Sequence, residues 1–426
     1  MAAAIEVLAD VEGRRRPVRL GLKAWGEAAR YAGAKDRAWV SGLVLDVLRR
    51  RRSTAWRMGD EAGRAAALGV LRFEWGWPLE RIAEAAAETP HGPGPLTEAE
   101  QGALAHPRNL AEASAPVRGD YPDWLDAAFA RAFGETRAEE GAELSARAPV
   151  DLRINALKTD PARALKALAP LHAEPAGVLE TAVRIAAPDP TTRTGAVETI
   201  PQFSKGWFEV QDLGSQIAAA CAGEVRGLQV LDLCAGGGGK TLALAAAMGN
   251  TGQIYAYDAD ARRLADTVRR GERAGVRNLQ VRSPIQPGAL DDLGGRMDLV
   301  FVDAPCSGTG SWRRHPDTKW RLTPEALARR MAEQDAVLDQ AASFVKPGGR
   351  LVYVTCSVLP EEDEDRVAAF LERTPSFAAI PVATPPALAA HVTSEGWLRL
   401  SPRRSSTDGF FVAVLARRDD RAPKPS

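Results

Sequence analysis

From about residue 212 onward, short apolar runs alternate with segments of helical periodicity, and this alternation constrains the fold more than any other feature. It predicts an α/β domain with a doubly wound parallel sheet and right-handed crossovers. Such sheets bind ligands beyond the carboxyl ends of their strands. The predicted strands are 229–233, 253–257, 279–281, 299–302, 350–355 and 410–416.

The first predicted strand leads into four consecutive glycines, residues 236–239, at the expected start of a helix. Glycines there let the backbone approach a ligand and direct helix N-terminal N–H groups at it. Asp258 follows nineteen residues after Gly239, at the end of the next strand, where a carboxylate suits a ribose diol. A nucleotide-hydrolysing P-loop is the alternative, with Asp303 as its second acidic element, but its pattern requires glycine where this chain has Cys234.

Two cysteines stand just beyond the ends of two later strands. Strand 299–302 is followed by Asp303 and then Cys306, and strand 350–355 by Cys356. If the two strands are neighbours, their backbones lie about 4.8 Å apart and both thiols open into one cleft beside Asp303. The four cysteines of the chain form no CxxC pair, which argues against a zinc site and a disulfide framework and suits a reducing cytoplasm.

Two thiols beside an acid suit covalent chemistry on cytosine. A thiolate that adds to C6 makes C5 nucleophilic enough to attack a methyl sulfonium. A second thiol or a base then assists loss of H5 and expulsion of the first thiol, and an acid can hydrogen-bond the N3/N4 face of the ring. We expect a helix after Ser357 to help lower the pKa of the attacking thiol. The acidic residues 361–364 are interpreted as the start of that helix, without a catalytic role.

These motifs resemble those of the NOL/Sun-type RNA (cytosine-5) methyltransferases, and among them the RsmB-like enzymes of bacteria. Residues 232–241 (DLCAGGGGKT) resemble the family's cofactor loop, and residues 303–310 (DAPCSGTG) and 355–357 (TCS) its two cysteine motifs. Three further segments resemble the start of the catalytic domain, an RNA-facing loop and the last motif: 210–216, 313–320 and 408–411. The resemblance implies a Rossmann-like, S-adenosylmethionine-dependent methyltransferase domain.

The resemblance also implies roles for individual residues. Cys356 would be the nucleophile and Cys306 would help release the product, while Asp303 and Lys240 complete the catalytic set. The residues implied for S-adenosylmethionine are Cys234, Ala235, Gly236, Gly237, Gly238, Gly239, Lys240, Asp258 and Asp303. The family loop usually has proline where this chain has Gly237. Residues 282–285 lack the acidic residue that usually contacts the adenine. No metal is expected.

The upstream part of the chain predicts two smaller domains. Strand signals at 152–154, 183–185 and 207–210, with a helix at 161–168, indicate a small α+β unit that resembles the family's RNA-recognition-like pre-domain. Residues 31–54 resemble the NusB-like helical domain of RsmB-type enzymes. The expected division is 1–145 all-α, NusB-like and RNA-binding, 146–211 small α+β, 212–418 Rossmann-like methyltransferase, and 419–426 a disordered tail.

The charge distribution and the resemblance together point to RNA. Net charge is zero, but residues 1–58 carry 13 Lys or Arg against 6 Asp or Glu, including four arginines at 49–52. These arginines either contact phosphates or complement a helix end. We expect phosphate contacts there and at Arg313, Arg314 and Lys319. The expected substrate is 16S rRNA; tRNA and a non-catalytic role in ribosome assembly are the alternatives. Without a signal peptide or an apolar run of about 18 residues, we expect a cytoplasmic monomer with no membrane contact.

Overall fold

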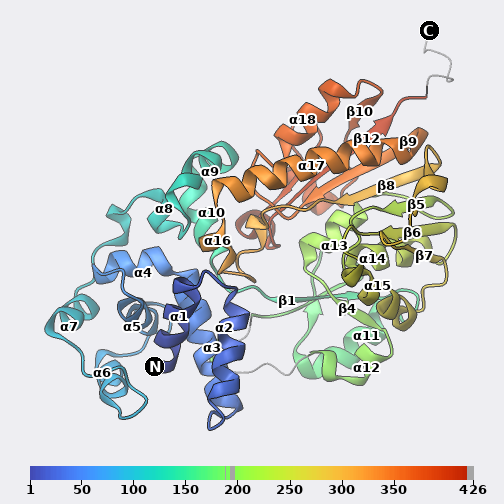
Figure 1. Cartoon of the computed structure of the whole chain (residues 1–426). Coiled ribbons are helices and arrows are strands. Elements are labelled where there is room, and N and C mark those ends of the chain that lie inside the picture. Colours follow the sequence, from blue (N-terminus) through green and yellow to red (C-terminus); the bar gives the residue numbers. More distant parts are fainter. Residues whose placement is uncertain (188, 192–196, 420–426) are drawn as a thin grey trace. The chain divides into compact units, whose positions relative to one another are not determined.

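The computed structural model describes residues 1–187, 189–191 and 197–419, so most of the expected tail, residues 420–426, lies outside the described part. The chain forms two compact units, drawn in Figure 1. The helical unit comprises Met1–Ala148, Pro188–Thr194 and Ser311–Leu322, and the sheet unit comprises Pro149–Ala187, Gly195–Gly310 and Thr323–Ser426. None of the described helices is both long and apolar enough to cross a bilayer.

The sheet unit is built on a large mixed sheet (Figure 1). In sheet order its strands are β10 (Phe377–Ile380), β12 (Phe410–Arg417), β9 (Val345–Thr355), β8 (Met297–Asp303), β5 (Gln229–Asp232), β6 (Gln253–Tyr257) and β7 (Leu279–Arg282), with β11 (Leu398–Leu400) paired to β12. The strands from β9 to β7 are parallel, which confirms the predicted α/β core.

The strand at Phe410–Arg417 does not follow the predicted parallel pattern. It enters between β9 and β10 and runs antiparallel to both. The cause lies in the preceding connection. Helix α18 (Glu364–Arg373) carries the chain from β9 to β10, but only short elements lie between Ile380 and Phe410. A parallel strand would need another long crossover, so β12 enters the sheet from the opposite end.

Helices cover both faces of this sheet (Figure 1). On one face, α13 (Leu213–Ala220) and α14 (Gly239–Met248) pack against alternate residues of the parallel strands, with α15 (Ala261–Ala274) beside them. On the other face, α17 (Pro324–Phe344) and α18 cover the remaining residues of the same strands. Both clusters are apolar and buried, as a sheet with two covered faces requires.

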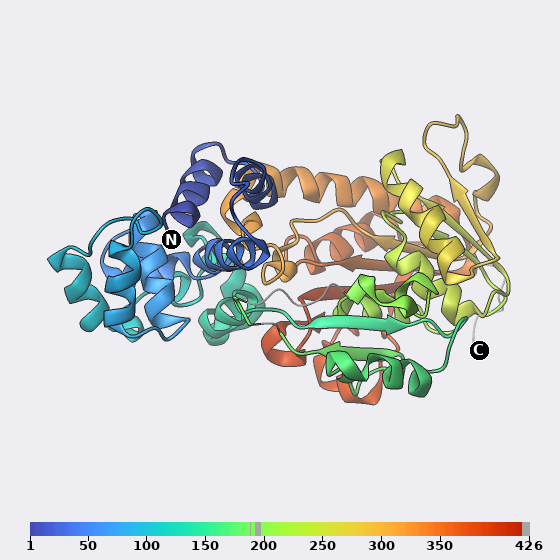
Figure 2. The same cartoon turned by 90° about the horizontal axis from the view of Figure 1, so that it is seen from below.

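A smaller antiparallel sheet precedes the large one; it lies below the large sheet in Figure 1 and faces the viewer in Figure 2. Its strands, in sheet order, are β2 (Glu174–Pro175), β3 (Ala182–Ile185), β1 (Val150–Ile154) and β4 (Phe208–Val210). Helix α11 (Pro161–Leu168) packs Ala164 and Leu168 against this sheet, and α12 (Pro201–Ser204) precedes β4. The predicted helix at 161–168 and the strands near 152, 183 and 208 are confirmed.

The N-terminal unit is helical, as predicted. Its helices are α1 (Ala2–Gly13), α2 (Val18–Ala28), α3 (Ala34–Arg49), α4 (Arg51–Met58), α5 (Gly63–Phe73), α6 (Leu79–Ala87), α7 (Glu98–Ala105), α8 (Ala115–Arg118), α9 (Asp126–Phe133), α10 (Arg137–Leu144) and α16 (Thr318–Arg321). Leu43, Val47 and Leu68 lie in its buried core. Residues 89–95, between α6 and α7, contain no helix or strand.

The segment 311–322, expected as an RNA-facing loop, belongs to the core of the helical unit. Trp312 is fully buried, and its ring stacks on Phe129 at 5.9 Å between centroids. Lys319 is also fully buried and donates hydrogen bonds to the carbonyl of Arg49 at 2.9 Å and to Ser145 Oγ at 2.7 Å. Burial lowers the pKa of Lys319 to about 7.

Burial excludes two of the three phosphate contacts that we expect in this segment. Lys319 and Arg313 are enclosed by the helical unit and cannot reach a phosphate in solution, so the contacts predicted for them are wrong. Arg314 is only half-buried, and the contact expected of it stays a prediction.

The arginine run at 49–52 is also mostly occupied within the helical unit. Arg49 is buried, with its guanidinium 2.9 Å from Asp46. The other three pair with separate carboxylates: Arg50 with Glu74 at 3.2 Å, Arg51 with Glu12 at 3.2 Å and Arg52 with Asp123 at 2.7 Å. Arg49 lies in the last turn of α3, where a cation complements the helix end, so this alternative is confirmed for Arg49. Arg50, Arg51 and Arg52 are only half-buried, and phosphate contacts of these three stay a prediction.

Candidate active site

The glycine loop lies between β5 and α14 and requires glycine for its backbone. Gly236 and Gly238 have φ angles of 54° and 82°, which favour glycine. A Cβ on Gly238 would lie 2.9 Å from the side chain of Thr267. Gly238 is the N-cap of α14, so the first N–H groups of this helix face the end of β5. This is the strand–loop–helix geometry predicted for cofactor binding.

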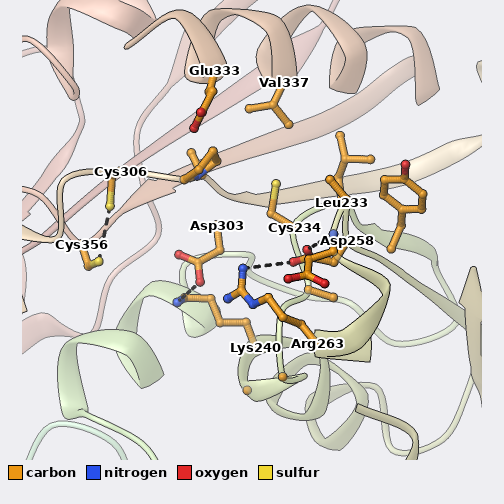
Figure 3. A pocket seen from close by; sticks show the side chains of 18 of the residues that line it. Leu233, Cys234, Lys240, Asp258, Arg263, Asp303, Cys306, Glu333, Val337 and Cys356 are labelled. Carbon is orange, nitrogen blue, oxygen red and sulfur yellow. Dashed lines mark hydrogen bonds and ion pairs between the residues drawn. The ribbon is translucent and has the colours of Figure 1, made fainter. Parts of the chain in front are cut away.

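Asp258 lies at the end of β6, beside the glycine loop, as its position in the sequence predicts. One carboxylate oxygen accepts a hydrogen bond from the Gly236 N–H at 2.8 Å, and the other accepts from the Asp260 N–H at 2.8 Å. Arg263 of α15 lies 3.4 Å from the same carboxylate and was not predicted (Figure 3). Only the fold brings Arg263 there, because nothing in its local sequence distinguishes it from the other arginines of α15.

The two cysteines meet where β8 and β9 end. These strands are adjacent and parallel, with Asp303 in register with Val354. The sulfur atoms of Cys306 and Cys356 lie 3.4 Å apart and point toward one another (Figure 3). The hydrogen bond to Cys356, together with burial, raises the pKa of Cys306 well above that of a free thiol. The pair is therefore suited to hold its proton on Cys306.

Asp303 and Lys240 form an ion pair between the end of β8 and the start of α14. Lys240 Nζ lies 2.6 Å from Asp303 Oδ2 (Figure 3). It also lies 5.2 Å from the centroid of the Phe410 ring. Burial opposes the charged lysine, but Asp303 outweighs it and the pKa of Lys240 is raised. The side chain of Asp303 remains about one-third exposed, at 32%. One of its oxygens is thus held by lysine while the side chain still reaches the pocket.

Cys234 lies on the same pocket but in a different environment. Burial, followed by the nearby charge of Asp232, raises the pKa of its thiol. The fourth cysteine, Cys221, is buried in the core, which raises its pKa to about 12. All four cysteines are free thiols. These environments leave Cys306 and Cys356 as the pair with a geometry for chemistry.

The prediction for the segment after Ser357 is wrong. Helix α18 begins only at Glu364, so no helix N-terminus follows the Cys356 thiol directly. Glu362 and Asp363 lie in the preceding turn and are buried, at 0% and 1% exposed. Their carboxylates are used inside the protein: Asp363 accepts from Thr355 Oγ1 at 2.5 Å, and Glu362 accepts from Ser307. A run of acidic residues before a helix does not indicate in the sequence that any of them is buried.

A pocket of about 970 Å³ joins these groups, a size typical of small-molecule sites. Its lining includes Cys234, Ala235, Gly237, Gly239, Lys240, Asp258, Asp303, Cys306 and Cys356. Helix α17, to which the sequence assigns no function, contributes Glu333 and Val337 from the opposite side (Figure 3). Among the described residues, no group of three or more His, Cys, Asp or Glu side chains could hold a metal ion.

The pocket fits S-adenosylmethionine on two structural grounds. Gly237 and Gly239 line the pocket at the start of α14, where backbone can approach a ligand closely. The buried Asp258 carboxylate stands at the second strand end, where a ribose diol is bound in this architecture. Fold and site together define a Rossmann-like methyltransferase that depends on S-adenosylmethionine.

Comparison with known proteins agrees with this class. A family described as 16S rRNA methyltransferase RsmB/F matches residues 223–416. The probable ribosomal RNA small subunit methyltransferase B of Synechocystis sp. is 34% identical over 301 residues, covering 69% of this chain and 66% of that protein. The ribosomal RNA small subunit methyltransferase B of Citrobacter koseri is 33% identical over 317 residues, covering 72% and 69%. The match thus spans about two thirds of these relatives.

Solved structures share the fold. The crystal structure of PH0851 matches with a TM-score of 0.71 and 23% identity, covering 97% of each chain. The structure of NSun6 from Pyrococcus horikoshii with SFG matches with a TM-score of 0.61 and 20% identity, covering 70% of this chain and 99% of that one. On the strength of the sequence relatives, the chain belongs to the RsmB/F family of 16S rRNA methyltransferases.

Proposed function

We propose that this protein methylates carbon 5 of a cytosine in 16S rRNA, through a covalent bond between Cys356 and C6. The observation that carries the proposal is the pair of sulfur atoms 3.4 Å apart at the ends of β8 and β9, in the pocket that also contains the glycine loop. Enzymes that methylate an unactivated pyrimidine carbon need a nucleophile on C6 and a proton acceptor for H5. This pair offers one sulfur for each task.

In this mechanism Cys356 attacks the base and Cys306 acts in product release. The Cys356 thiolate adds to C6, and the ring electrons move to make C5 nucleophilic. Bound S-adenosylmethionine supplies the electrophilic methyl group that C5 takes. In the release step Cys306 passes its proton to Cys356 across the 3.4 Å contact and accepts H5. The C5–H electrons form the C5–C6 double bond, the C6–S electrons return to Cys356, and one proton goes to solvent.

Asp303 and Lys240 hold the base and stabilise its charge in this proposal. The 2.6 Å ion pair fixes the Asp303 carboxyl beside the cysteines, where it can hydrogen-bond the N3/N4 edge of cytosine. Lys240 keeps a positive charge near the ring as electrons move into it. Residues Cys234 to Lys240, together with Asp258 and Asp303, hold the cofactor. In this proposal the chain has three domains: a helical RNA-binding domain at 1–145, a small α+β domain at 146–211 and the methyltransferase domain at 212–418.

The helical unit offers a surface for the RNA. A groove of about 750 Å³ is lined by Arg51, Trp56, Arg108, Trp124 and Trp320, among others. The guanidinium of Arg51 lies 5.5 Å from the Trp320 ring centroid, and that of Arg108 lies 5.9 Å from Trp56. Tryptophan rings stack unpaired bases, and arginines hold the phosphates between them. This groove, and not the buried Arg49 or Lys319, is the proposed RNA contact, and the protein acts as a cytoplasmic monomer.

Transfer of labelled methyl groups to RNA tests the proposal. The purified protein would be incubated with labelled S-adenosylmethionine and either 16S rRNA or tRNA, with Cys356→Ala as the matched control. We expect label at C5 of cytosine in 16S rRNA and none with the variant. Label in tRNA alone would change the substrate. Absence of label in any RNA would favour the non-catalytic assembly role.

A further inference from the structure

The loop that carries Cys306 rests on a buried carboxylate. Glu362 is fully buried in the turn before α18. Its Oε1 accepts the Ser307 backbone N–H at 2.7 Å, and its Oε2 accepts the Ser307 hydroxyl. The side-chain amide of Gln334, on α17, donates to the same Oε1 at 3.0 Å. Three neutral donors therefore converge on one acidic side chain.

These bonds hold the residues on both sides of Cys306. Ser307 follows it and binds Glu362 directly. Pro305 precedes it, and its carbonyl accepts from the Gln334 amide at 2.9 Å. Glu362 is itself fixed, because its backbone carbonyl accepts from Tyr353 Oη of β9 at 2.7 Å. The direction of the Cys306 side chain is therefore set by the network centred on Glu362.

The same loop is joined to the Cys356 segment further along. The Gly310 N–H donates to the carbonyl of Cys356 at 2.9 Å, and Thr309 Oγ1 accepts from the Val358 N–H at 3.0 Å. Glu362 thus braces one end of the loop, while the segment after Cys356 holds the other. Between these two attachments the sulfur of Cys306 has little freedom except to face Cys356.

We propose that Glu362 is a positioning residue for the release half of the reaction, which directs the Cys306 thiol at Cys356 and makes Cys306 the proton-carrying member of the pair. The inference rests on the proposed covalent mechanism. The pKa of Cys306 is raised by the hydrogen bond to Cys356, by burial and by the charge of Cys356, and the negative charge of Glu362 adds to these causes. Sequence alone indicates only a helix start for this residue.

Glu362→Gln is the direct test, because an amide can accept at only one of its two terminal atoms and carries no charge. We expect the first methyl transfer to persist, turnover to fall by roughly tenfold or more, and an RNA–protein adduct to accumulate as in Cys306→Ala. Glu364→Gln is the matched control. Glu364 pairs with Arg399 at 2.6 Å, away from the cysteine loop, so this variant should turn over like the wild type.

A second measurement does not depend on methyl transfer. Alkylation of Cys306 would be followed against pH by mass spectrometry, in a Cys356→Ser background with and without Glu362→Gln. Loss of the nearby negative charge should move the reaction of Cys306 to lower pH by roughly one unit. An unmoved profile, or wild-type turnover without adduct, would overturn the inference. If the wild type transfers no methyl group, the proposed function fails, and the alkylation profile still decides the effect of Glu362.

Ser307→Ala covers the case in which Glu362→Gln does not fold. It removes the hydroxyl donor and leaves the backbone N–H bond to Glu362 in place. Adduct accumulation with Ser307→Ala would support the inference, although more weakly than with Glu362→Gln. A Ser307→Ala enzyme with wild-type turnover and no adduct would count against it.

Discussion

Lys240 Nζ lies 2.6 Å from Asp303 Oδ2, so one ion pair connects the start of α14 to the end of β8. The cofactor loop and the first cysteine motif are therefore held at a fixed separation by charge as well as by the sheet. Because Lys240 is buried and Asp303 remains partly exposed, the pair can be strong without closing the pocket.

Lys240→Met and Asp303→Asn should have non-additive effects on methyl transfer. Each single change breaks the ion pair, so the double variant should lose less than the sum of the two. We expect a coupling of about 1 kcal/mol, discounted for the exposure of Asp303. The measurement is kcat/KM for the four proteins of a double-mutant cycle. Additive losses would show that the two side chains act independently.

Cys356→Ala and Cys306→Ala should fail at different steps. Cys356→Ala should form no covalent RNA adduct and no product, because the sulfur that attacks C6 is gone. Cys306→Ala should methylate once and accumulate an RNA-linked protein that survives denaturing electrophoresis. The double variant should form no adduct. An adduct in Cys356→Ala and none in Cys306→Ala would reverse the roles, and normal turnover by Cys356→Ala would end the covalent mechanism.

Gly238→Ala should weaken S-adenosylmethionine binding by roughly tenfold or more. Its φ of 82° disfavours a side chain by about 1–2 kcal/mol, and the added Cβ would press on Thr267. Gly227→Ala is the matched control, because its φ of 74° imposes a similar backbone strain outside the pocket and a Cβ there meets nothing within 4 Å. Calorimetric titration with the cofactor compares the two. If Gly238→Ala and Gly227→Ala bound the cofactor with equal affinity, the backbone geometry of the loop would not be required for cofactor binding.

Lys319 should make the stability of the protein depend on pH. Its folded-state pKa of about 7 lies below the usual 10.5, so the folded chain releases a proton that the unfolded chain keeps. Stability contributed by this group therefore rises as pH increases from about 7 toward 10.5. Urea unfolding at pH 7 and pH 9 should show a rise on the order of 1–2 kcal/mol that Lys319→Met lacks. The same pH difference in both proteins would contradict this assignment.

Arg51→Gln with Arg108→Gln should weaken RNA binding and reduce its salt dependence. Removing one phosphate interaction with a single strand reduces the slope of log affinity against log salt by about 0.7, so the double variant should show a reduction of about 1.4. Trp124→Ala should weaken binding with little change in slope, because stacking releases no counterions. Arg19→Gln removes an exposed cation outside the groove and serves as control. An unchanged slope in the double variant would exclude the groove as the site of RNA binding.

The parallel core and the order of its strand ends could be predicted from the amino-acid sequence. Apolar runs separated by helical patterns specify such a sheet, and side chains at its carboxyl edge share one site whatever their distance in the chain. Cys306, Cys356, Asp303 and the glycine loop could therefore be placed together in advance. The residue types at the strand ends were sufficient for this prediction, because packing of the fold seldom requires glycine or cysteine at such positions.

The surroundings of the charged residues could not be predicted in this way, because they depend on contacts that form only in the folded protein. Lysine and glutamate usually lie on the solvated surface, yet Lys319 and Glu362 are both fully buried. The partners that hold them, Ser145 and Ser307, are distant in sequence and carry no signal of their own. Burial of a charge depends on donors and acceptors that the whole fold assembles around it, and no local pattern records that assembly.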